Sequence, residues 1–184
     1  MYQQSAESNS HAHNDARRTA RSELTDKRLH QIRDLLGRQK PKEALSLASG
    51  SGTEGVPFRN ARAVCLMRLG DAEQAVRILK SLTVTGGITL RTDSPLECQI
   101  NFATALAMSG NARGAVSVLD TIDRDDDPRI LRLRDAIAHW QTRLTWWEWI
   151  QWVGGVAISR PVPLDFEPGE LIAPQDGARG DSQR

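Results

Sequence analysis

Apolar residues recur at helical spacing in two stretches of the chain, residues 59–82 and residues 98–122. Each stretch has an apolar-periodic run, a Gly–Asp or Gly–Asn turn and a second such run, which is the pattern of a helix hairpin. Aligned on Gly70 and Gly110, the stretches pair Ala63 with Ala103, Leu66 with Leu106, Ala75 with Ala115, Val76 with Val116, Leu79 with Leu119 and Leu82 with Ile122. A single hairpin cannot bury its apolar face alone, so we expect the copies to stack.

A weaker copy of the same pattern lies upstream, in residues 28–48. Its turn glycine is Gly37, and Pro41 suits the first turn of its second helix. The positions equivalent to the aligned apolar residues are Ile32, Leu35, Leu36 and Ala44. The chain is therefore expected to contain about three helix hairpins.

Capping signals indicate where several of these helices begin. Residues 71–74 (Asp-Ala-Glu-Gln) and residues 94–97 (Ser-Pro-Leu-Glu) have the spacing of capping boxes, and Asn111 can cap the helix that follows it. Asp127 precedes a last helix, which we expect to run from residue 129 to about residue 153. This last helix is long and rich in tryptophan.

Composition divides the chain into three parts. Residues 1–22 are polar and lack periodicity, so we expect them to be disordered. Residues 23–153 form the predicted helical repeat domain. Residues 154–184 begin with two glycines and contain four prolines, so we expect an extended arm followed by a disordered tail.

The repeated segment, residues 28–122, resembles the tetratricopeptide repeat. The resemblance rests on small residues where two helices cross (Ala63 with Ala75, and the equivalent pair in the next copy), on the turn glycine, and on the large apolar residue Leu79 or Leu119. The spacing between copies is irregular, whereas the family repeat is about 34 residues long. The resemblance implies an all-α, right-handed stack of antiparallel hairpins, here closed by the tryptophan-rich C-terminal helix.

In this family the first helix of each hairpin lines a concave groove, and the resemblance therefore implies a set of groove residues. Four of them share one helix face at i, i+4, i+7 and i+11 spacing: Glu97, Asn101, Thr104 and Met108. The equivalent face of the preceding hairpin carries Asn60, Val64, Met67 and Arg68, and the first hairpin contributes Arg33. Arg, Asn and adaptable Met side chains suit peptide binding, although any solvated helix face can have this composition.

All five tryptophans lie between residues 140 and 152. Helical spacing places Trp140 and Trp147 on a stripe with Leu133, Ile137 and Leu144, which would cap the open end of the stack.

The remaining aromatic side chains, which we take as a candidate interface, are Trp146, Trp149 and Trp152. Three candidates could cover this aromatic surface: the C-terminal arm, a protein partner or a membrane surface. Arg129, Arg132, Arg134 and Arg143 would suit anionic lipid. Val162, Leu164 and Phe166 alternate along the arm, so an extended chain would present them on one side. We expect the arm to dock on this face, with Phe166 against Trp149 or a neighbouring tryptophan.

The sequence contains none of the common catalytic motifs, so we expect neither an enzyme nor a cofactor. His11 and His13 have a ligand-like spacing but fall in the polar N-terminal segment, and the acidic residues 123–127 lack the pattern of an EF-hand loop; we expect no metal site. Cys65 and Cys98 are expected to stay reduced.

A formal net charge of +1 argues against general binding to nucleic acid. No export signal or membrane-spanning run is evident, so the expected location is cytoplasmic.

These observations lead to two functional hypotheses. The first is a non-enzymatic protein–protein interaction module that binds a peptide or protein in the groove of the stacked hairpins. The alternative is a peripheral membrane adaptor, anchored through the Trp- and Arg-rich helix 129–153. Vesicle binding would distinguish the two.

Overall fold

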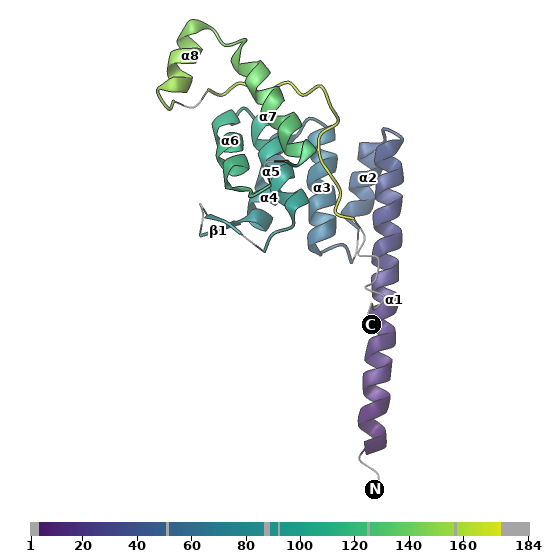
Figure 1. The fold of residues 1–184 in the computed structure, drawn as a ribbon. Helices are drawn as coiled ribbons and strands as arrows, with labels where there is room; N and C mark the ends of the chain where they lie inside the picture. The colour runs from purple at the N-terminus through teal and green to yellow at the C-terminus, as the bar shows by residue number, and fades with distance from the viewer. Residues whose placement is uncertain are drawn as a thin grey trace.

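The computed structural model describes residues 4–173, except residues 51, 87, 88, 92, 125 and 157, and it describes side chains from residue 19 onward. Within these residues the chain forms eight helices and one two-stranded hairpin (Figure 1). The prediction of an all-α fold is therefore confirmed at the level of fold class. None of the described helices has both the length and the apolar composition needed to cross a membrane.

Helix α1 (Gln4–Gly37) corrects the expectation that residues 1–22 are disordered, because it begins at Gln4. No glycine or proline occurs before Gly37, so nothing in this stretch interrupts a helix. Figure 1 shows the first half of α1 extending beyond the other helices. Its last turns bury Leu29, Ile32 and Leu36. Helix α2 (Pro41–Ala48) follows, with Pro41 in its first turn as expected.

The next four helices are α3 (Val56–Arg68), α4 (Ala72–Thr83), α5 (Leu96–Met108) and α6 (Ala112–Thr121). Gly70 and Gly110 adopt φ values of 85° and 87° in the turns between the two pairs. These left-handed conformations favour glycine, and they end α3 and α5 where the aligned pattern predicted a turn.

The predicted caps are confirmed at two starts and wrong at one. Asp71 accepts a hydrogen bond from the amide of Gln74 at 3.1 Å, and Asn111 accepts one from the amide of Gly114 at 2.9 Å. At the start of α5, however, Pro95 occupies the capping position and no side chain caps the helix. Ser94 therefore lies one residue before the capping position and outside the geometry that a capping box requires.

A short antiparallel hairpin, β1 (Val84–Thr85) and β2 (Thr89–Leu90), lies within the long loop between α4 and α5.

Each helix from α1 to α6 packs on the next one along the chain. Contacts also join α1 to α3, α3 to α5, and α5 to α7 (Pro128–Gln141). The four alanines at the predicted helix crossings are fully buried: Ala63, Ala75, Ala103 and Ala115. Ten consecutive residues of α5, residues 98–107, are buried on every side of the helix. Such a helix needs a cover on each face, and the C-terminal residues supply one of them.

The predicted single helix over residues 129–153 is wrong, because the structure has two helices there. Helix α7 ends at Gln141, and α8 (Trp146–Val153) begins after Thr145, whose φ and ψ of −63° and 160° are extended. Thr145 and Glu148 form a complete capping box, which starts a new helix and turns the chain. Leu133, Ile137 and Trp140 are buried as expected, but Trp147 is turned away and is 64% exposed.

The C-terminal arm, defined as residues 158–173, folds back onto the helices. In Figure 1 its yellow trace runs past α7 and then beside α3 toward α2. Val162 is buried, Leu164 and Phe166 are partly buried, and the residues between them are exposed, which agrees with the predicted alternation. The expected contact of Phe166 with Trp149 is wrong. Phe166 lies beneath the guanidinium group of Arg132, and Trp149 is 55% exposed.

Candidate functional site

The arm covers the face of α3, α5 and α7, which we call the groove. Two buried carboxamides form its centre, Asn60 on α3 and Asn101 on α5, and neither side chain is accessible to solvent. The Nδ2 group of Asn101 donates to Oδ1 of Asn60 at 2.8 Å, so the two amides are joined. Buried amides need hydrogen-bond partners for their remaining polar atoms, and here the arm provides them.

The main chain of Glu170 satisfies both carboxamides. Its amide donates to Oδ1 of Asn101 at 2.8 Å, and its carbonyl accepts from Nδ2 of Asn101 at 2.7 Å and from Nδ2 of Asn60 at 2.8 Å. Asn101 therefore holds both polar groups of one residue, as a neighbouring β-strand would. These hydrogen bonds involve only the main chain of Glu170, so they do not depend on which side chain stands at position 170.

Arg68, at the end of α3, binds the arm through charge. Its Nη1 lies 2.9 Å from Oε2 of Glu167, and its Nε donates to the carbonyl of Pro168 at 3.3 Å. The amide of Gln39, between α1 and α2, also donates to the Glu167 carboxylate. The Arg68 side chain is 16% exposed and that of Glu167 is 55% exposed, so the ion pair lies at the edge of the groove.

Gly169 allows the arm to approach α3 closely. Its φ is 90°, and a Cβ atom at this position would lie 2.9 Å from Cε of Met67 and from both methyl groups of Val64. Both neighbours are buried, so they have little room to move. Only glycine combines this backbone conformation with this separation.

The other end of the arm is held by main-chain contacts with the turn between α5 and α6. The amide of Val162 donates to the carbonyl of Ala107 at 2.9 Å, and Ser159 forms an isolated antiparallel bridge with Asn111. A Cβ on Gly110 would lie 3.1 Å from the main chain of the arm. The two ends together anchor the arm across the groove.

The structure therefore places several of the predicted groove residues under the arm: Asn60, Val64, Met67, Arg68 and Asn101. Thr104 lines a narrow space beside Phe166, and its hydroxyl donates to the Ile100 carbonyl of its own helix at 2.9 Å.

The other three predicted groove residues lie elsewhere. Glu97 faces Arg129, with 3.8 Å between their charged atoms. Met108 is partly buried near Pro161, and Arg33 is exposed on α1.

Sequence reasoning missed Gln39 and Gly169 as contributors to this site. Gly169 follows Pro168, and this Pro–Gly pair was an available signal for a special backbone conformation. Nothing in the local sequence of Gln39 indicates that its side chain meets a residue far along the chain.

A second surface is formed by α8, none of whose residues is buried. Its exposed apolar side chains, each at least 39% accessible, are Trp146, Trp147, Trp149, Ile150 and Val153. Trp152 is different: it is partly buried and packs edge-to-face on Trp140 with 5.6 Å between ring centroids. Arg113 lies over the Trp152 ring at 4.9 Å.

Three of the arginines proposed for lipid contact instead make contacts within the protein. Arg129 pairs with Asp127 at 2.7 Å, Arg132 lies over Phe166, and Arg134 reaches Asp120 at 3.4 Å. The lipid hypothesis therefore depends mainly on the tryptophans of α8.

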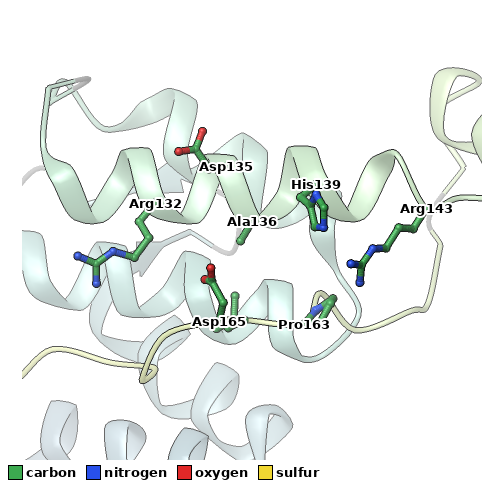
Figure 2. Close-up of a pocket in the computed structure, with 8 residues that line it drawn as sticks. Arg132, Asp135, Ala136, His139, Arg143, Pro163 and Asp165 are labelled. Carbon is green, nitrogen blue, oxygen red and sulfur yellow. The ribbon is translucent and has the colours of Figure 1, made fainter.

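An open cavity of about 420 Å³ lies between α7 and the arm. Figure 2 shows side chains from both segments around it; the lining residues are Arg132, Asp135, Ala136, His139, Arg143, Pro163, Leu164 and Asp165. Two guanidinium groups, an imidazole and two carboxylates make this lining polar and of mixed charge.

The two cysteines and the acidic residues show no reactive arrangement among the described residues. Burial raises the pKa of the Cys65 thiol to about 11 and that of Cys98 to about 12. Both thiols are therefore protonated at neutral pH and are weak nucleophiles. In the part of the chain that the structure describes, no group of three or more His, Cys, Asp or Glu residues is placed to bind a metal ion.

A scan against protein-family models and searches of curated proteins and of solved structures found no match to this chain.

Proposed function

We propose that this protein is a non-enzymatic interaction module that binds an extended peptide segment of a partner in the groove. In this proposal its helices form a tetratricopeptide-like, right-handed stack of helix hairpins. The aligned glycine turns support this view, as do the contacts of α1 with α3, of α3 with α5 and of α5 with α7. In such a stack the first helices of successive hairpins share one face.

The observation that carries the proposal is the pairing of Asn60 and Asn101 with the main chain of Glu170. Binding an extended chain through its backbone, with side chains in neighbouring spaces, is a recurrent mode of peptide recognition. A chain that covers the groove takes both amides out of water and must therefore supply their hydrogen bonds, because each buried polar group left unpaired costs about 1–3 kcal/mol. The groove is thus suited to an extended chain, and the arm occupies it when no partner is bound.

A peptide-display selection on the full-length protein tests this function. We expect enriched peptides that bind the wild-type chain and lose binding to an Asn60→Leu variant. Gln99→Leu is the matched control, because Gln99 is also a buried amide but donates to the main chain of Ser94 rather than to the arm. A selection that yields only peptides indifferent to Asn60 would contradict the proposal.

A second candidate, contact with a membrane surface through α8, is favoured by its exposed tryptophans. Trp146, Trp147 and Trp149 are 64%, 64% and 55% exposed, and tryptophan is enriched at the level of lipid headgroups. Co-sedimentation with phosphatidylcholine vesicles, with and without phosphatidylserine, tests it. The wild type should sediment with vesicles and a Trp146→Ser/Trp149→Ser variant should not; equal sedimentation of both would exclude α8 as the contact.

A further inference from the structure

The arm shows which sequence the groove accepts, and each contact in residues 167–170 has a different chemical requirement. Glu167 supplies a carboxylate to Arg68 and Gln39. Pro168 supplies a carbonyl to Nε of Arg68. Gly169 has no side chain to collide with Val64 and Met67, and Glu170 contributes only its main chain to the two asparagines.

We propose that the groove selects an extended partner segment in which an acidic residue is followed two positions later by glycine, and that this segment displaces the arm. This inference rests on the proposed function and adds its specificity. Glycine is required because a Cβ atom would collide with α3. The acidic residue is required because it pairs with Arg68. The residue after the glycine bonds to the two asparagines through its main chain. A partner with the pattern Glu/Asp-X-Gly-X therefore meets the ion-pair, steric and main-chain contacts that the arm makes at this point.

Displacement is compatible with how the arm is attached. The segment between α8 and the arm begins with Gly154 and Gly155, and Gly155 has a φ of 84° with no neighbouring atom near a Cβ position. The ion pair of Glu167 is half exposed, so a competing carboxylate can reach Arg68 from solvent. The arm is a tethered competitor, and its high local concentration weakens the apparent affinity of any free segment.

Competition between the arm and a free peptide provides the test. The probe is a fluorescein-labelled peptide with the sequence of residues 158–173, and its anisotropy is measured with the full-length protein. In the protein, Gly169→Ala should release the arm by forcing a Cβ against Val64 and Met67, and this variant should bind the peptide at least about tenfold more tightly than wild type does. Gly86→Ala, in the loop between β1 and β2, is the control for strain at positive φ: its φ is 63°, no neighbouring atom lies within 4 Å of its Cβ position, and it should bind as wild type does.

A second variant that releases the arm controls for the possibility that Gly169→Ala misfolds. Glu170→Pro removes the amide that donates to Asn101, at a position outside the helices. It should also bind the peptide more tightly than wild type does. Circular dichroism of both variants should show the helical content of the wild type.

Changes within the peptide test the sequence requirement. On either released protein, a peptide with alanine at the position of Gly169 or glutamine at the position of Glu167 should bind at least about tenfold more weakly than the unmodified peptide. Equal binding of the three peptides, or no binding to either released protein, would overturn the proposed selectivity. Display selection can still succeed with unrelated sequences in that case, so the proposed function and this specificity can fail separately.

Discussion

Replacing Asn101 with leucine tests how strongly the groove holds the arm. The side chain makes three hydrogen bonds: one to Oδ1 of Asn60, one to the carbonyl of Glu170 and one from the amide of Glu170. Each is worth about 0.5–1.5 kcal/mol net, so their sum is roughly 1.5–4.5 kcal/mol. Leucine has a similar volume and recovers some apolar burial, and we therefore expect the free energy of unfolding to fall by about 1–3 kcal/mol.

Two measurements on the Asn101→Leu protein separate loss of the arm from general destabilisation. Urea unfolding gives the free-energy change, and hydrogen exchange reports on the amide of Glu170, which should lose its protection. Gln99→Leu is again the control: its amide nitrogen donates to the carbonyl of Ser94 at 2.9 Å, so it should lower stability while Glu170 stays protected. An Asn101→Leu protein with unchanged stability and a protected Glu170 amide would refute the proposed anchoring role.

Three further predictions concern helices α6, α7 and α8. Ala115 is fully buried, so Ala115→Leu should overpack that site and lower the free energy of unfolding by about 1–3 kcal/mol in urea titrations; unchanged stability would refute the assigned crossing. Thr145→Ala removes the cap of α8 at a cost of about 0.5–2 kcal/mol, which should reduce helical circular dichroism and alter tryptophan fluorescence; identical spectra would show that the cap is dispensable. Hydrogen bonds from Arg129 lower the pKa of Asp127 to about 2, below its usual value of about 3.9, so the stability it adds is present above pH 4 and is lost as the pH falls toward 2. Asp127→Asn should remove that part of the acid dependence in pH-dependent denaturation, and an unchanged pH profile would contradict the assignment.

Local pattern predicted most of the helices, because helix formation depends on neighbours within a few residues. The 3.6-residue apolar period placed the helices on either side of Gly70 and Gly110, and Asp71 and Asn111 cap where they were expected to. Local signals in the sequence also account for two wrong predictions, the single helix over residues 129–153 and the disordered N-terminal segment. The Thr145–Glu148 capping box was present in the sequence and divides the expected long helix, and residues 4–22 contain no helix-breaking residue despite their polar composition.

The sequence also indicated that the arm would dock, because Val162, Leu164 and Phe166 alternate with exposed residues. It did not indicate where, and the tryptophan face was the wrong choice. The arm's position depends on Gly169 meeting Val64 and Met67, which lie about a hundred residues earlier in the chain.

By itself, then, the sequence determined most of the helices, the glycine turns between them and the apolar side of the arm, since each follows from interactions between residues close in the chain. Only the tertiary structure decided that Asn60 and Asn101 meet across α3 and α5 and that together they hold the main chain of Glu170. Helix packing brings the two amides together, and the arm that covers them supplies their remaining hydrogen bonds. No local pattern encodes that pairing, because it exists only once distant helices are in contact.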